Sequence, residues 1–121
     1  MPAPYRTTPT VNESFAERCS WFGDAPGWVD TGDNGKNASG LPQSVPGIAF
    51  YSRATLGHLW RVTFPNGFST IVKQVDIGPA PYTRRGIDIN ASLAAKAGYK
   101  PGNFPTNSII KFTYLGNHLI A

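Results

Sequence analysis

The chain has 121 residues, of which 40% are apolar and only 15% are charged, and it contains a single cysteine, Cys19. This length fits one domain that buries a core without help from disulfides or metal, and one cysteine excludes both an intramolecular disulfide and a metal site built on cysteines. The formal net charge of +4 permits an anionic partner, but the basic residues are scattered along the sequence, which argues against a dedicated nucleic-acid binder.

Residues 1–18 are predicted to form an extended N-terminal arm, followed by a folded domain over residues 19–121. The first fourteen residues, MPAPYRTTPTVNES, contain three prolines and no periodic apolar pattern. They lack the apolar core of a standard export signal, and no run in the chain approaches the roughly 18 apolar residues of a membrane helix. Within SFAERCSWF, Ser14 with Glu17 three residues later allows a turn of helix.

Residues 19–47 are rich in turn-forming sequence, such as the Asp-Asn-Gly of residues 33–35. A stretch of this length without clear strands is often functional. Trp21 and Trp28 lie in or beside it. One of them can belong to the core, but a tryptophan in a loop of glycine and aspartate is also a common sugar-stacking residue. Both are therefore candidate substrate-binding residues.

From residue 48 onward, the apolar pattern predicts several strands and one helix. Strands are expected in GIAFYS, LWRVTF, FSTIVKQVDI, RGIDI and IIKFTYLG, with a hairpin turn at Pro65-Asn66-Gly67. The segment NASLAAKAGY predicts a helix that Asn90 caps and Gly98 ends. The class is therefore all-β with at least five short strands. Unequal strands and long loops favour a compact barrel over a regular sandwich.

Asp76 and Asp88 stand out because each lies between β-branched residues in a predicted strand, in VDI and IDI. Two interpretations are open. In one, the carboxylates accept hydrogen bonds from backbone N–H groups in a tight crossover. In the other, burial and a second carboxylate nearby keep a carboxyl protonated near neutral pH, so that it acts as a general acid on a glycosidic bond.

The motifs occur in a recognisable order. SWFGD is followed by an ASG loop, then by GIAFYSRATLGHLWRVTFPNG, and then by VDIGPAPYTRRGIDINASLAAKAGY. This series resembles the double-psi β-barrel superfamily, with close parallels in the rare lipoprotein A family, the catalytic barrel of membrane-bound lytic transglycosylase A and the first domain of expansins. The resemblance covers about residues 20–116. It implies a small six-stranded double-psi β-barrel with one or two short helices and long loops.

The same resemblance implies action on peptidoglycan. In lytic transglycosylases one carboxyl protonates the leaving glycosidic oxygen, and the C6 hydroxyl of the sugar then closes a 1,6-anhydro ring. Carried onto this chain, Asp88 in GIDINASLAAKAG matches the catalytic acid, and Asp76 in QVDIGPA matches the aspartate that precedes it. Arg84 and Arg85, in the intervening loop, are candidates for contacting wall carboxylates, with a solvated pair as the alternative. Tyr82 either lines the groove or packs as a loop anchor.

The chain also departs from these families. DIGP stands where rare lipoprotein A relatives have DRGP, and the disulfides and second domain of expansins are missing from this sequence, as is a lipid-anchored signal. Three hypotheses follow: a lytic transglycosylase that cleaves the MurNAc–GlcNAc bond, a non-catalytic expansin-like module that binds glycan or loosens the wall, and a structural virion protein.

Partners and location follow from the same hypotheses. We expect peptidoglycan glycan strands as the partner, and neither nucleic acid nor a membrane span. The location is wall-facing, either extracellular or periplasmic, or on a phage virion, with residues 1–18 docking onto a larger assembly. We expect no cofactor and no metal, because the aspartates, His58 and His118 lack the spacing of a metal site.

Overall fold

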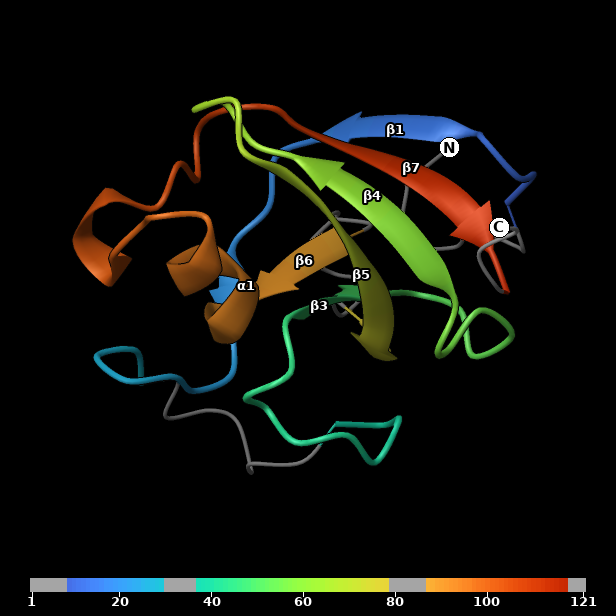
Figure 1. Cartoon of the computed structure of the whole chain (residues 1–121), viewed down its shortest axis with the longest axis horizontal. Helices are drawn as coiled ribbons and strands as arrows, with labels where there is room; N and C mark the ends of the chain where they lie inside the picture. Colours follow the sequence, from blue (N-terminus) through green and yellow to red (C-terminus); the bar gives the residue numbers. More distant parts are fainter. Residues whose placement is uncertain (1–8, 30–36, 79–86, 118–121) are drawn as a thin grey trace.

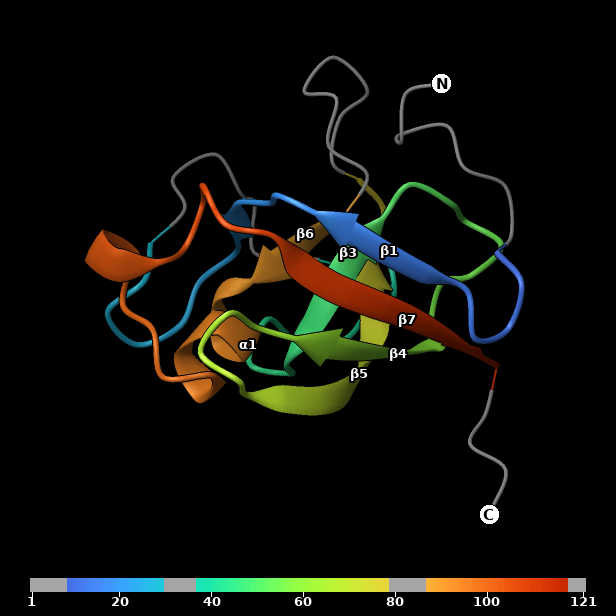
Figure 2. The same ribbon diagram turned by 90° about the horizontal axis from the view of Figure 1, so that it is seen from above.

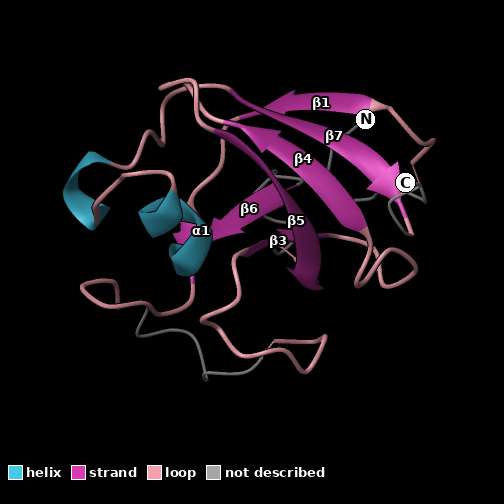
Figure 3. Ribbon diagram, in the orientation of Figure 1, coloured by secondary structure: helices cyan, strands magenta, loops and turns pink. Residues whose placement is uncertain are grey.

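The structure is a computed structural model that describes residues 9–29, 37–78 and 87–117. These residues form one curled half-barrel sheet of seven strands, in the order β1-β7-β4-β5-β3-β6-β2. The strands are β1 (Ser14–Glu17), β2 (Trp21–Phe22), β3 (Gly47–Phe50), β4 (Leu59–Thr63), β5 (Ser69–Asp76), β6 (Ile87–Asn90) and β7 (Ile110–Gly116). Helix α1 spans Ala91–Lys96, and a 3-10 turn, η3, spans Pro101–Asn103. Figures 1 and 3 show β1, β7, β4 and β5 side by side, with α1 at the end of β6.

The all-β class is thus confirmed, and so are the hairpin and the helix. Strands β4 and β5 pair antiparallel across the predicted turn, where Gly67 has a φ of 90° that favours glycine. The Asn90 side chain caps α1 by accepting a hydrogen bond from Leu93 N at 2.8 Å. Gly98, with a φ of 96°, follows the end of the helix. These features formed as predicted because each depends on neighbouring residues.

The core lies inside the curl of the sheet. Along β4, Trp60 and Val62 are fully buried while Arg61 between them is exposed, as the alternation predicted. The rings of Phe50 and Trp60 meet at 4.8 Å between centroids, so the core joins β3 to β4. In the described ranges no helix is long and apolar enough to cross a membrane.

The segment SFAERCSWF forms two strands, so the predicted turn of helix was wrong. Strand β1 pairs antiparallel with β7, and β2 pairs parallel with β6. Phe15 is buried, with its ring 5.7 Å from that of Trp60. A capping pattern contributes only about 1 kcal/mol, and burial of a phenylalanine side chain roughly 2 kcal/mol, so the sheet prevails. Residues 14–17 of the expected arm therefore lie in the sheet.

The sheet has seven strands in the described ranges where six were expected, and β1 and β2 occupy its two edges. Strand β3 pairs parallel with β5 and antiparallel with β6, and β6 in turn pairs parallel with β2. Curling brings β3 and β6 beneath β1 and β7, as Figure 2 shows.

Strands β3 and β5 approach each other closely at the start of β3. A Cβ atom on Gly47 would lie 2.6 Å from Val75 Cγ1 and 2.7 Å from the carbonyl oxygen of Lys73. Only glycine fits there, because real Cβ atoms do not approach other heavy atoms so closely. This contact fixes the position of β3, which carries the centre of the candidate site.

Candidate functional site

Asp76 and Asp88 lie in one row across three strands. Ala49 of β3 pairs with Asp88 of β6 on one side and with Asp76 of β5 on the other, where a register shift after Ile48 skips one residue of β5. Neighbouring strands lie about 4.8 Å apart, so the two aspartate Cα atoms are roughly 10 Å apart. Ile87 and Ile89 point into the core, so Asp88 between them faces away from it. We call these three residues, Asp76, Ala49 and Asp88, the aspartate row.

Asp88 joins β6 to the segment that leads into β2. Its side chain is only 6% exposed, and its Oδ1 accepts a hydrogen bond from Ser20 N at 3.1 Å. Ser20 directly precedes β2, whose Trp21 pairs with Ile89 of β6. The Asp88 side chain therefore adds one more hydrogen bond between β6 and the segment before β2, next to the backbone pairing of the two strands.

Asp76 orders the ASG loop in a similar way. Its Oδ1 accepts hydrogen bonds from Ala38 N at 3.0 Å and from its neighbour Ile77 N at 2.9 Å. One residue further on, Ser39 N donates to the carbonyl oxygen of Val75 at 3.1 Å. The ASG sequence, which was part of the family resemblance, thus supplies backbone donors to the end of β5.

At both aspartates, then, one carboxylate oxygen accepts a backbone N–H group, as the first of the two sequence-based interpretations describes. This anchoring uses Oδ1 in each case. The positions of Tyr82, Arg84 and Arg85, the predicted contacts from the loop between the aspartates, fall outside the described residues.

Trp28 is a core residue in this structure. It is 3% exposed, and its ring meets Trp21 edge-on at 5.0 Å and Phe104 edge-on at 6.4 Å between centroids. An indole buried to this extent offers no open face on which a sugar could lie flat. Trp21 is half-buried and packs against the same cluster. The structure therefore brings the two tryptophans together as a packing pair, and Trp21 pairs with Ile89, the residue that follows Asp88 on β6.

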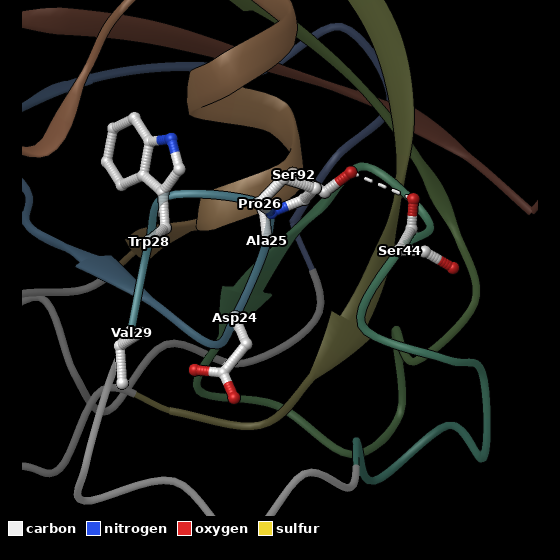
Figure 4. Close-up of a pocket in the computed structure, with 7 residues that line it drawn as sticks. All are labelled: Asp24, Ala25, Pro26, Trp28, Val29, Ser44 and Ser92. Carbon is white, nitrogen blue, oxygen red and sulfur yellow. Dashed lines mark hydrogen bonds between the residues drawn. The ribbon is translucent and has the colours of Figure 1, made fainter.

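A pocket of about 490 Å³ lies on the surface beside α1 (Figure 4). Its volume is within the usual range of small-molecule sites. The described residues that line it are Asp24, Ala25, Pro26, Trp28, Val29, Ser44 and Ser92. Ser92 Oγ donates to the carbonyl oxygen of Ser44 at 2.8 Å and so holds one wall. Neither aspartate of the row lines this pocket, so the pocket and the paired carboxylates are separate features.

Gln74 is a site-supporting residue that sequence reasoning missed. Its buried side chain donates from Nε2 to the carbonyl oxygens of Phe50 (3.0 Å), Ser52 (2.9 Å) and Asp76 (3.1 Å), while Oε1 accepts from Thr55 Oγ1. The end of β3 and the end of β5 are thereby held together beside the aspartate row. A signal was present: the period of two puts Gln74 on the apolar face of its strand, where a polar side chain needs partners.

Within the described ranges, no three side chains of histidine, cysteine, aspartate or glutamate gather as they would around a metal ion. No model of a known protein family matches the chain, and no curated protein matches it. The geometry of the aspartate row is therefore the main indication of function.

Proposed function

We propose that the chain acts on peptidoglycan as a lytic transglycosylase, cleaving the bond from N-acetylmuramic acid to N-acetylglucosamine. The aspartate row is the observation that carries the proposal. Two carboxylates that are 12 residues apart in sequence lie on the strands that flank β3, and both pair in register with Ala49. A double-psi β-barrel is part of the proposal. It is supported by the two parallel pairs, β3–β5 and β2–β6, on either side of the antiparallel pair β3–β6.

In this proposal Asp88 is the general acid and then the base. Its Oδ1 is held by Ser20 N–H, and the carboxyl proton passes to the glycosidic oxygen as the bond to C1 breaks. The C6 hydroxyl of the same sugar then bonds to C1 and returns its proton to the Asp88 carboxylate. The product is a 1,6-anhydro sugar, and no water is consumed. Asp76 orders the loop that borders the site and adds negative charge beside the developing oxocarbenium ion.

A second candidate function has one observation in its favour. Both aspartates accept backbone N–H groups, which is what a purely structural pair of carboxylates would do. A non-catalytic module that binds glycan or loosens the wall would need no more than this. It would bind sacculi and release no products.

The deciding experiment compares the wild type with Asp88→Asn on purified sacculi, with mass spectrometry of the soluble products. Asparagine keeps an oxygen to accept the Ser20 N–H bond but cannot transfer a proton, so the fold is retained while the chemistry is lost. Glu13→Gln is the matched control, because Glu13 is exposed and accepts a bond only locally, from Thr10 N.

We expect anhydro-muropeptides from the wild type and from Glu13→Gln, and none from Asp88→Asn. Products with a reducing end would mean hydrolysis, with water positioned in place of the C6 hydroxyl. If the wild type and both variants bind sacculi and none releases products, the chain is a non-catalytic binding module and the proposed enzyme activity is wrong.

The proposal also covers location. A protein with this activity works at the wall, either outside the cytoplasmic membrane or on a phage particle. Because residues 14–17 pair within the sheet, docking of the N-terminal arm onto a larger assembly would use the residues before position 14.

A further inference from the structure

The outward face of the strands β1, β7, β4 and β5 carries three exposed cations. They are Arg61 on β4, Lys73 on β5 and Lys111 on β7, each between buried neighbours on its own strand. Alternation along each strand therefore points all three away from the core. In the sequence these residues are far apart, and no basic stripe is visible.

Strand register brings the three cations into a line. Lys73 pairs with Leu59, two residues before Arg61 on β4, and Arg61 pairs with Thr113, two residues after Lys111 on β7. Each cation is therefore one strand across and two residues along from the next. Such diagonal neighbours are about 7–8 Å apart. We call Lys73, Arg61 and Lys111 the basic diagonal.

No acidic side chain of the described residues neutralises the basic diagonal. None of its three members forms an ion pair with a described residue. Glu17, the acidic residue of β1, lies on the other side of its strand from the outward Ser14 and Ala16, with its Oε2 buried. Asp76 lies three residues beyond Lys73 on β5, roughly 10 Å along the strand. Glu13, exposed next to Ser14, accepts a hydrogen bond from Thr10 N. Among the described residues, the three cations therefore give this face a net positive charge.

The spacing of the cations fits a linear polymer with a charge in every repeat. A polyol phosphate with a three-carbon polyol has six backbone bonds between successive phosphates. An extended peptide residue has three backbone bonds and spans about 3.5 Å, so the phosphates of an extended polymer recur at roughly 7 Å. Single-stranded nucleic acid has the same backbone period but also binds through stacking of its bases on aromatic rings. The outward positions of β1, β4, β5 and β7 hold no aromatic side chain.

We propose that the basic diagonal binds a linear polyol phosphate polymer of the bacterial wall. The polymer lies along the outward face and crosses β5, β4 and β7, with successive phosphates at Lys73, Arg61 and Lys111. The other residues of the face are short hydroxyl or aliphatic side chains, such as Thr63 and Thr113, which leave room for it. Binding of this kind retains the protein at the wall, and it does not depend on the aspartate row being catalytic.

The test measures binding of fluorescently labelled poly(glycerol phosphate) by anisotropy at about 50 and 200 mM salt, a range over which counterion release changes affinity strongly. The variant is Arg61→Gln/Lys73→Gln/Lys111→Gln. The matched control is Arg53→Gln/Lys96→Gln/Lys100→Gln, which removes the same charge from exposed positions off this face. All six positions are exposed, so both triple variants should fold, and circular dichroism checks this.

We expect the diagonal variant to bind at least ~10-fold more weakly at low salt. The slope of log affinity against log salt should fall by about two, because each neutralised charge contributes roughly 0.7. The control variant should keep most of its affinity and slope. Asp88→Asn should bind as the wild type does, which separates this proposal from the proposed catalysis.

Three results would overturn the proposal. Equal losses in the two triple variants would show that net charge acts, and not the diagonal. If an unstructured single-stranded DNA of equal charge binds as tightly as poly(glycerol phosphate), the ligand is a nucleic acid. Binding to vesicles with anionic lipid but not to the polymer would point to a membrane surface.

Discussion

The strongest test of the fold around the site is removal of the Asn90 side chain. Asn90 ends β6, two residues after Asp88, and is 1% exposed. Its Oδ1 accepts from Gly47 N at 3.0 Å and from Leu93 N at 2.8 Å, and its Nδ2 donates to the carbonyl oxygen of Val45 at 2.7 Å. One side chain thus connects β6, the first turn of α1 and the start of β3.

Asn90→Ala removes all three hydrogen bonds from a site that water does not reach. A net contribution of about 1 kcal/mol per bond predicts a loss of about 3 kcal/mol in the free energy of unfolding. That is a large part of the 5–15 kcal/mol of an ordinary domain. Asn90→Ser keeps a good helix cap for Leu93 but is too short to reach β3, so it should lose about 2 kcal/mol.

Urea denaturation followed by tryptophan fluorescence measures both losses at an unchanged m value. The control is Asn103→Ala, because Asn103 is exposed and its Oδ1 accepts a bond from Lys100 N within one turn. It should cost less than about 1 kcal/mol, since exposed groups find water instead. A loss for Asn90→Ala no larger than that of the control would refute the reasoning that Asn90 connects the three segments.

Two further predictions concern packing and pH. Gly47→Ala should lower the free energy of unfolding, measured by urea denaturation, by at least about 2 kcal/mol, because the new Cβ overlaps the backbone of β5. Gly102→Ala has open space around it and should be close to neutral. Equal effects of the two substitutions would contradict the close approach of β3 and β5. Burial raises the pKa of the Tyr114 phenol above 10.0, so the unfolded chain loses this proton first and the free energy of unfolding falls as the pH rises above 10. Tyr114→Phe should flatten this alkaline decline in the free energy of unfolding. At neutral pH it should cost about 1 kcal/mol, because the hydrogen bond of 2.6 Å between Tyr114 Oη and His58 Nδ1 is lost. An unchanged pH profile would contradict the assignment of the decline to Tyr114.

The candidate site was predictable only in part. The sequence marked Asp76 and Asp88, because a carboxylate between β-branched residues is unusual, and the ASG loop came from the family resemblance. Ala49 carried no signal of its own, although it is the residue that both aspartates flank. The basic diagonal was hidden for the same reason. Which residues are neighbours across a sheet depends on register, and register is set by pairing between distant segments.

The sequence by itself determined the local features of this protein. The turn at Gly67 and the Asn90 cap are decided by interactions within four residues, which a sequence displays directly. Tertiary structure decided the rest. The pairing of Ser14 with Thr113 made β1 a strand despite a capping pattern, and ring packing placed Trp28 in the core despite its loop sequence. In both cases the energy comes from apolar burial and backbone pairing with residues far along the chain, and it exceeds the roughly 1 kcal/mol of a local preference.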